Sequence, residues 1–396
     1  AIVAVAVAAV AFVALLFREE AIADARPPVS ALQAPRLSNA SELTLLAHGS
    51  CSDQFKPQRW WRVVLGLSPQ LFVYNGDIVY GDCEAAPCKE LRDAWSALFA
   101  DPDFGAAASR LSMEGILDDH DYGQNDCTAS NPHKGFAKAL FLNRFAVPST
   151  DPRWNRPGLY HARTFGGAGR RVQLITLDTR WFRAPFKPTD CPYCPGRERY
   201  VPYNQSAGEG AGATMLGEAQ WAWLNATLRQ PAELRLVVST VQVLSSGHGW
   251  ECWRMIPSEL VRLQRLIAET RAGGVLLLTG DRHAGGFYRL PAAEGGPPYD
   301  LYEVTASSLT HSFRPSDGST RPDEVDPYRI GAQVHENHFG TIAIDWFARQ
   351  LTLRLITSDD CGVAPQAWHR SCLSHDDHAG RTLADITISF DDLQPQ

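Results

Sequence analysis

The sequence predicts an α/β fold in which a largely parallel sheet is flanked by helices. In the first two thirds of the chain, short apolar runs alternate with segments whose apolar residues recur at helical spacing. In the last third, apolar runs follow one another directly, which indicates a mixed or antiparallel edge. There is no internal repeat and no clear second domain, so we expect one folded unit over residues 43–396.

The first half of the chain alternates most regularly. We place strands where short apolar runs end in turn residues, and helices where apolar positions recur between start and stop signals. The helix over 57–66, for example, has Pro at its start and Gly at its end. The expected elements, in order, are a strand over 43–47, a helix over 57–66, a strand over 71–74, helices over 90–100 and 103–111, a strand over 113–117, a helix over 134–145 and strands over 160–165 and 171–177.

The second half begins with a long segment, residues 182–212, that is rich in Pro, Gly and Tyr and predicts an ordered loop. The next helix, over 216–228, carries Trp221, Leu224 and Leu228 on one face. The remaining expected elements are a strand over 234–244, a helix over 257–270 and strands over 275–278, 301–305, 340–346, 351–357 and 383–390.

The composition is that of a folded protein without a nucleic-acid-binding role. Charged residues make up 20% of the chain and hydrophobic residues 44%. The formal net charge is -7, and there is no long basic run. Affinity for nucleic acid comes mostly from Lys and Arg on phosphates, so this balance argues against it. An anionic substrate would need local positive charge, which metal ions can supply.

The first 17 residues are apolar and uncharged, which predicts a membrane anchor or a signal peptide. An A-x-A pattern at residues 23–25 is a candidate cleavage site. Residues 18–42 contain an Ala-, Pro- and Ser-rich stretch and predict a linker. Both interpretations place the folded domain in the secretory pathway and outside the cytosol, secreted or anchored through residues 1–17.

Nine cysteines fit such an oxidising compartment, where disulfides persist. The odd count leaves at least one cysteine unpaired or paired between chains. We expect up to four bridges, with the short loops Cys83–Cys88 and Cys361–Cys372 as candidates. The connectivity cannot be read from the sequence. Sequons at Asn39, Asn204 and Asn225 are compatible with glycosylation.

Cys191-Pro-Tyr-Cys194 has the spacing of a glutaredoxin motif. A redox-active pair of this kind needs a helix that starts at the first cysteine and lowers the pKa of its thiol. Here the pair lies between Pro188 and Pro195, which favours a structural disulfide over a redox site.

Side chains that can bind metal follow four of the predicted strands. They are Cys51, Asp77 with Tyr80, the run from Asp118 to Asn125, and Asp281 with His283. Parallel strands bring their carboxyl ends to one edge of a sheet, so these side chains should meet there. Thiolate, phenolate, imidazole and carboxylate together suit transition metals better than magnesium alone.

Each of these residues also has a structural interpretation. Cys51 can be half of a disulfide, although the odd cysteine count favours a free thiol there, and Tyr80 can be a core aromatic. Asp118, Asp121 and Asp126 can cap a helix or a turn, or one of them can be a further ligand. We interpret His48 as structural and the late cluster of His and Asp at residues 369–378 as a solvated loop.

A set of short motifs connects these residues to a known family. The motifs are GSCSDQFKPQRWW, LFVYNGDIVYGD, GILDDHDYGQND, LITLDTRWF, LGEAQWAWLNATL, VVSTVQVL, LLTGDRHAGGFY, EVTASSLTHSF and HFGTIAIDW. In order and style they resemble the alkaline phosphatase D (PhoD-like) family of the calcineurin-like metallophosphoesterases. The resemblance covers about residues 43–346. It implies an α/β sandwich with two central mixed sheets flanked by helices, four layers in all.

The resemblance also implies a set of metal ligands. Asp77 would bridge two metal ions, while Cys51 and Tyr80 would bind a ferric ion. Asp119 would bind the second metal, and Asp281 and His283 fall where the superfamily has a His-x-His pair. The implied cofactors are two or more metal ions, with Fe(III) and Ca(II) favoured and Mn, Zn or Mg possible.

His120 aligns with the superfamily's catalytic histidine. Tentative substrate-binding residues are Asn125, Arg180 and Arg282, although the two arginines can equally be ion-pair residues of the scaffold. Gln242 is a weak candidate for a further ligand.

The implied activity is the hydrolysis of a small phosphorylated substrate by a hydroxide held between two metals, with His120 aiding the leaving group. The motifs do not separate a phosphomonoesterase from a phosphodiesterase that acts on lipid or nucleotide diesters. Two other classes remain as alternatives. One is a non-catalytic lumenal binding protein, which the retained ligand set argues against, and the other is a thiol oxidoreductase acting through Cys191 and Cys194.

Overall fold

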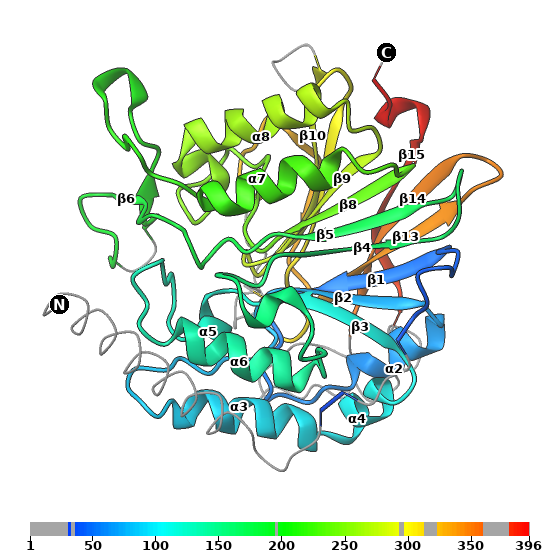
Figure 1. Cartoon of the computed structure of the whole chain (residues 1–396), viewed down its shortest axis with the longest axis horizontal. Coiled ribbons are helices and arrows are strands. Elements are labelled where there is room, and N and C mark those ends of the chain that lie inside the picture. The colour runs from blue at the N-terminus through cyan, green and yellow to red at the C-terminus, as the bar shows by residue number, and fades with distance from the viewer. Residues whose placement is uncertain are drawn as a thin grey trace, which may run out of the picture.

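Two β-sheets lie face to face between two layers of helices (Figure 1). The structure is a computed structural model that describes residues 31–32, 36–194, 197–292, 297–312, 323–358 and 380–395. Both sheets mix parallel and antiparallel strands, so the four-layer α/β sandwich is confirmed. The apolar segment 1–17, the Cys361–Cys372 pair and the cluster at 369–378 lie outside the described residues.

The first sheet has the strand order β15-β14-β13-β1-β2-β3. Its strands are β1 (Leu45–Gly49), β2 (Leu71–Asn75), β3 (Ser112–Ile116), β13 (His338–Asp345), β14 (Gln350–Thr357) and β15 (Thr382–Ser389). The strands β1, β2 and β3 run parallel, whereas β13, β14 and β15 add an antiparallel half.

The second sheet has the order β12-β10-β11-β9-β8-β5-β4. Its strands are β4 (His161–Phe165), β5 (Val172–Thr176), β8 (Leu234–Ser239), β9 (Val275–Thr279), β10 (Gly285–Leu290), β11 (Leu301–Ala306) and β12 (Arg329–Val334). The four central strands β11, β9, β8 and β5 are parallel, and antiparallel strands complete both edges.

Helices cover the outer face of each sheet (Figure 1). On the outside of the first sheet lie α2 (Trp60–Leu67), α3 (Lys89–Ala100), α4 (Pro102–Ala108), the short α5 (Asp119–Tyr122) and α6 (Lys134–Arg144). On the outside of the second lie α7 (Gly217–Leu228) and α8 (Pro257–Thr270). Among the helices of the described segments, none is long and apolar enough to span a membrane.

The central strands of the second sheet are largely apolar because they supply two cores at once. In β8, Leu236 and Val238 join the core between the sheets, while Val237 joins the core under α7 and α8. In β9, Leu276 joins the core between the sheets and Leu277 the core under the helices. Side chains of a strand alternate between its faces, and each fully buried aliphatic side chain contributes about 1.5–3 kcal/mol. A strand covered on both faces therefore needs apolar residues on both of them.

Several predicted boundaries are wrong. The helix expected from Pro57 begins at Trp60. The strand expected over 234–244 ends at Ser239, whose hydroxyl donates to the Val241 carbonyl at 2.7 Å as the chain bends toward the polar edge. Strands β10 and β12 were not predicted, since the glycines in both interrupt the apolar alternation.

Residues 182–194 and 197–212 belong to the expected long loop and contain a short two-stranded ribbon of β6 (Lys187–Pro188) and β7 (Tyr200–Val201). The turn of this ribbon holds a disulfide between Cys191 and Cys194, and no helix starts at Cys191. The second disulfide of the described residues is Cys83–Cys88.

The described part of the predicted linker contacts the folded domain. The guanidinium of Arg36 donates to the carbonyl of Ala146 at 2.6 Å, and the backbone N–H of Leu37 donates to the Ser112 hydroxyl at 3.2 Å.

Candidate metal centre

The predicted ligands come together at the edge where strands of both sheets end. Cys51 follows β1 and Asp77 follows β2. Asp119 follows β3, and Asp281 and His283 follow β9 of the second sheet. These side chains therefore lie at a common edge, as predicted. Strands of both sheets, and not of one sheet alone, end at this edge.

The backbone at these positions is unusual. Cys51, Asp77, Asp281 and His283 have φ values of 62°, 44°, 68° and 50°, in the left-handed region. Few residues other than glycine occupy this region, and strained backbone of this kind concentrates at functional sites. Gly76, before Asp77, has a φ of 101°, and a Cβ there would lie 2.5 Å from the Cβ of Asp118. Only glycine permits this close approach of the β2 turn to the end of β3.

One group of donors consists of Cys51, Asp77, Tyr80 and His283. The Cys51 Sγ lies 3.5 Å from Asp77 Oδ2, and the Tyr80 hydroxyl lies 3.3 Å from the same oxygen. The Tyr80 hydroxyl is also 3.0 Å from Nε2 of His283. Sulfur, carboxylate oxygen, phenol oxygen and imidazole nitrogen thus converge on one point, which is a ligand set typical of a transition metal.

Burial shows why this group fits a cation. Cys51 is 0% exposed and Asp77 is 1% exposed. Burial raises the pKa of Cys51, Asp77 and Tyr80 well above their usual values, with neighbouring anions adding to the effect. The Asp77 Oδ1 atom is buried without a hydrogen-bond partner. Buried anionic groups need a positive partner, and a bound metal would provide it and favour their deprotonated forms.

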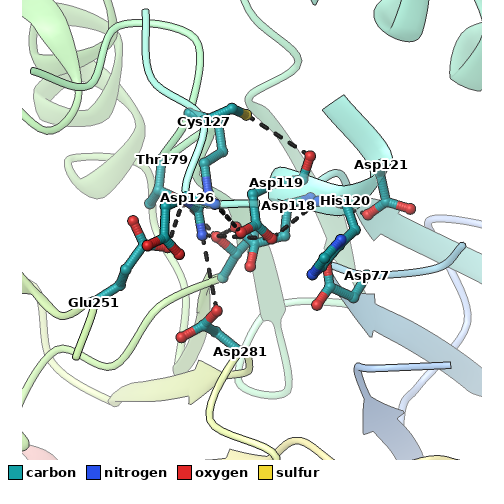
Figure 2. A network of polar contacts seen from close by, with 12 residues as sticks. Asp77, Asp118, Asp119, His120, Asp121, Asp126, Cys127, Thr179, Glu251 and Asp281 are labelled. Carbon is teal, nitrogen blue, oxygen red and sulfur yellow. Dashed lines mark hydrogen bonds and ion pairs between the residues drawn. The ribbon is translucent and has the colours of Figure 1, made fainter. Parts of the chain in front are cut away.

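A second group of donors shares Asp77 with the first. Donor atoms of Asp77, Asp119 and His120 lie within 4.8 Å of one another, as do those of Asp118, Asp119 and Asp281. Figure 2 shows His120 beside Asp77, with the acidic side chains gathered around Asp119. The purely carboxylate set suits a hard cation.

Asp119 is held as an anion in this group. Its oxygens accept from the backbone N–H of His120 at 2.9 Å and of Asp126 at 2.6 Å. Although burial opposes it, the positive charges of Arg180 and His120 hold the pKa of Asp119 well below its usual range. A buried carboxylate that stays ionised is suited to binding metal.

His120 is oriented by a residue that the sequence analysis did not single out. Its Nδ1 lies 2.7 Å from Oδ1 of Asp82, and its ring packs on Tyr80 with centroids 4.4 Å apart. Burial lowers the pKa of His120, but Asp119 and the bond to Asp82 outweigh it and raise the pKa to about 11. Asp82 thus fixes one ring nitrogen of His120 and leaves the other free for a ligand. Asp82 is the last residue of the LFVYNGDIVYGD motif, and its place in that motif is the sequence feature that could have identified it as a site residue.

Arg180 is an ion-pair residue next to the second donor group. It is 1% exposed, its Nε lies 2.5 Å from Asp118 Oδ1, and its Nη1 lies 2.6 Å from Glu251 Oε2. Glu251 also pairs with Arg183 at 2.5 Å. Despite these two cations, burial raises the pKa of Glu251 to about 7. The geometry matches the scaffold interpretation of Arg180, because its guanidinium is already occupied by carboxylates.

The structure assigns no contact with the donor groups to the tentative substrate-binding residues Arg282 and Asn125 or a ligand role to Gln242; their described contacts are with other residues. Arg282 is 4% exposed and pairs with Glu324, and Asn125 is exposed. The Gln242 amide is engaged at both ends, by Thr305 at 2.9 Å and by a ring nitrogen of His248 at 2.9 Å.

The three remaining polar candidates have structural contacts. Asp121 accepts the backbone N–H of Val79 at 2.8 Å and of Asp118 at 3.0 Å, which caps the turn into α5. Asp126 pairs with Arg199 at 2.7 Å, although its carboxylate also lies near those of Asp119 and Glu251. His48 is fully buried, with its Nδ1 2.8 Å from the Asn75 amide.

Sequence reasoning also missed Glu251 and His311. Glu251 follows no apolar strand, so it lacked the pattern that identified the other acidic residues. The ring of His311 stacks on that of His283 with centroids 4.2 Å apart. It also lies next to the Tyr80 ring, with centroids 5.6 Å apart, so His311 packs against two candidate ligands. His311 lies in the EVTASSLTHSF motif, which was noted without a role.

Comparison with known proteins shows the family and the fold of this chain. Residues 46–355 match the family model described as PhoD-like phosphatase. The chain is similar to the solved structure of PhoD, with 15% identity and a TM-score of 0.65 over 91% of this chain and 72% of that one. A structure of GAP50, the anchor in the inner membrane complex of Plasmodium, aligns at 11% identity and a TM-score of 0.49, over 88% of this chain and 89% of that one. No curated protein sequence matches the chain.

Proposed function

The chain belongs to the PhoD-like phosphatase family, and from this premise we propose that it hydrolyses phosphate esters at the centre around Asp77. One observation carries the proposal. Asp77 belongs both to the group with Cys51 and His283 and to the group with Asp119 and His120. A carboxylate shared by two donor groups is what a dinuclear site requires.

The two groups differ in chemistry, and this supports two different metals. Thiolate and phenolate donors from Cys51 and Tyr80 favour a ferric ion in the first position. The set of Asp118, Asp119 and Asp281 offers only carboxylate oxygens, which favours calcium in the second, with Mn, Zn or Mg as alternatives. When bound, the metals would supply positive charge for phosphoryl oxygens and lower the pKa of a water molecule.

The protein's own residues account for the remaining requirements. His120 has one ring nitrogen bonded to Asp82 and the other available to a substrate, which suits it to protonate or stabilise a leaving oxygen. Arg180 pairs with Asp118 and Glu251, and its positive charge contributes to the low pKa of Asp119. Phosphomonoesters are the proposed substrates. Lipid or nucleotide phosphodiesters are the alternative, and the test below distinguishes the two substrate classes.

We place the reaction outside the cytosol. The two disulfides of the described residues support this proposal, since disulfides persist in oxidising compartments.

The test compares hydrolysis of p-nitrophenyl phosphate with that of its bis-ester by the full chain supplied with iron and calcium. Faster turnover of the monoester supports the phosphatase, and faster turnover of the diester favours a phosphodiesterase. Asp77→Asn should abolish turnover and metal binding together, whereas Asp93→Asn, an exposed residue paired with Lys89 on α3, should change neither. Turnover that persists in metal-free Asp77→Asn protein would refute the proposal.

A further inference from the structure

Two serine hydroxyls lie against the sulfur of Cys51, and neither serine is a member of the two donor groups. The Oγ of Ser307 is 3.2 Å from the Cys51 Sγ, and the Oγ of Ser50 is 3.3 Å from it. Cys51, Ser50 and Ser307 are each 0% exposed. Hydrogen bonds in such a buried environment are electrostatically stronger than the same bonds in water. The two hydroxyls are therefore placed to act on this sulfur.

The two serines come from different sheets and are held by the backbone. Ser50 follows β1 of the first sheet, and Ser307 follows β11 of the second. The backbone N–H of Ser50 donates to the carbonyl of Ala306 at 3.1 Å, and the N–H of Leu309 donates to the carbonyl of Ser50 at 3.0 Å. These bonds join the two strand ends and fix the serines on either side of the sulfur.

Ser307 also contacts a second candidate ligand. Its hydroxyl oxygen accepts the backbone N–H of His283 at 2.9 Å. This bond uses a lone pair of the oxygen and leaves the hydroxyl proton available to the sulfur of Cys51. One side chain thus connects two members of the first donor group.

The Ser50 hydroxyl has a close fit beside the turn that carries Asp281. A Cβ at residue 280 would lie 2.5 Å from the Ser50 Oγ, so Gly280 leaves room for the hydroxyl. The hydroxyl also lies 3.5 Å from the carbonyl oxygen of Ala306. A charged acceptor makes a stronger hydrogen bond than a neutral carbonyl, so an anionic sulfur would be the preferred acceptor.

The direction of these hydrogen bonds follows from the form of Cys51 that binds metal. As a thiol, Cys51 can donate its proton to Oδ2 of Asp77 at 3.5 Å. A cysteine that binds metal is deprotonated, so its sulfur can only accept, and Ser307 and Ser50 must be the donors. Hydrogen bonds to a metal-bound sulfur tune the metal, because they draw electron density away from the sulfur.

We propose that Ser307 and Ser50 are positioning residues that donate hydrogen bonds to the thiolate of Cys51 and limit its electron donation to the metal of the first donor group. This inference rests on the proposed function and deepens it. A strongly donating thiolate would offset the positive charge on which phosphate ester hydrolysis depends. Two neutral hydroxyl donors weaken that donation without adding a charge to the site.

The probe is Co(II), added to the metal-free full chain. A bond between cobalt and a thiolate gives a near-ultraviolet charge-transfer band, so the band reports only the position that includes the sulfur. Cys51→Ala should lack this band. Ser307→Ala should move the band to longer wavelength, since a sulfur without its hydrogen bond gives up an electron more readily. It should also raise the dissociation constant for Co(II) about tenfold, a loss of about 1.4 kcal/mol.

A second variant and a matched control complete the series. Ser50→Ala should shift the band in the same direction and raise the dissociation constant roughly threefold, because this hydroxyl is farther from the sulfur. Ser52→Ala should change neither quantity. Ser52 is also fully buried and adjoins Cys51, but its hydroxyl donates to Oε1 of Gln58 at 3.0 Å. Thermal unfolding checks that each variant is folded.

Three results would overturn the proposal: a wild-type complex without the thiolate band, a band that persists in Cys51→Ala, or folded serine variants whose band stays at the wild-type wavelength. A lower melting temperature with an unmoved band would mean that the serines are purely structural. If Ser307→Ala does not fold, Ser50→Ala decides alone.

The outcome is separable from that of the proposed hydrolysis. Band shifts in the variants of a protein that hydrolyses neither ester would support the role of the serines and count against the proposed function. Hydrolysis by the wild type, with an unmoved band in the variants, would support the proposed function and reject the role of the serines.

Discussion

The contact between Asp82 and His120 yields the sharpest prediction. Asp82 orients the proposed catalytic histidine, and Asp82 itself belongs to neither donor group. The Nδ1 to Oδ1 distance is 2.7 Å, and the two side chains are 16% exposed for His120 and 49% exposed for Asp82. We therefore expect changes at Asp82 to lower kcat and to leave metal content intact.

The size of the effect follows from the exposure of the pair. Hydrogen bonds to charged groups contribute about 1.5–3 kcal/mol when buried, and exposed ion pairs about 0.2–1 kcal/mol. With Asp82 half exposed, we take about 1.5 kcal/mol for the whole contact, or roughly a tenfold loss of kcat. Removing only the charge should cost about half of that, or roughly threefold to fourfold.

Two substitutions separate these contributions without straining the backbone. Asp82 has a φ of 35°, a region that glycine and asparagine tolerate better than alanine. Asp82→Asn keeps an acceptor for His120 and loses the charge, while Asp82→Gly removes the contact. The assay is steady-state hydrolysis of p-nitrophenyl phosphate, with the metal content of each protein measured by elemental analysis.

The comparison needs one reference variant and one control. His120→Ala should lower kcat further, by about 10²-fold or more, because it removes the group itself. Asp93→Asn, an exposed acid in an ion pair on α3, should have no effect. If Asp82→Gly keeps full kcat, or loses metal along with activity, the assignment of Asp82 as a positioning residue is wrong.

Three further predictions concern the metal, the buried ion pairs and pH. Tyr80→Phe should remove the phenolate contribution to the visible charge-transfer spectrum of a ferric ion and keep the fold, and a spectrum identical to that of the wild type would contradict the assignment of Tyr80 as a ligand. Glu251→Ala leaves Arg180 and Arg183 without their shared carboxylate and should lower the free energy of unfolding by about 3–5 kcal/mol in urea titrations, whereas a loss below about 1 kcal/mol would show that the pairs are not coupled to stability. Burial raises the pKa of Glu303 from 4.5 to about 7, so the folded state binds its proton more tightly, and stability from this group should fall by about 3 kcal/mol as pH rises from about 4.5 to 7. In urea titrations, the fall in stability between these pH values should be smaller in Glu303→Gln than in the wild type by about 3 kcal/mol, and equal slopes would refute the assignment.

The order of elements could be predicted because each strand carries its own signal. The runs that became β2 and β9 are almost entirely apolar, β5 is apolar apart from Gln173 and Thr176, and the helices between them show apolar positions on one face. The strands β10 and β12 were missed because the glycines within them break that pattern. Their strand conformation depends on pairing with β11 and with each other, which is a long-range interaction.

The meeting of the candidate metal ligands was predictable for the same local reason. Cys51, Asp77, Asp119 and His283 each follow an apolar run, and parallel strands end at a common edge. The partners of Asp82, Glu251 and Arg180 were not predictable, because each contact joins residues far apart in the chain: Asp82 with His120, and Arg180 with Asp118 and Glu251.

The sequence by itself therefore determined the α/β class, the family resemblance and the polar residues that end each strand, since these depend on local patterns of apolar and turn-forming residues. Only the tertiary structure decided which of those residues meet. It brought the ends of strands from two sheets together so that Asp77 is shared by two donor groups, and it placed the guanidinium of Arg180 against the carboxylates of Asp118 and Glu251. The physical reason is that burial and charge at these positions are set by neighbours distant in sequence, and the packing of the sheets brings those neighbours together.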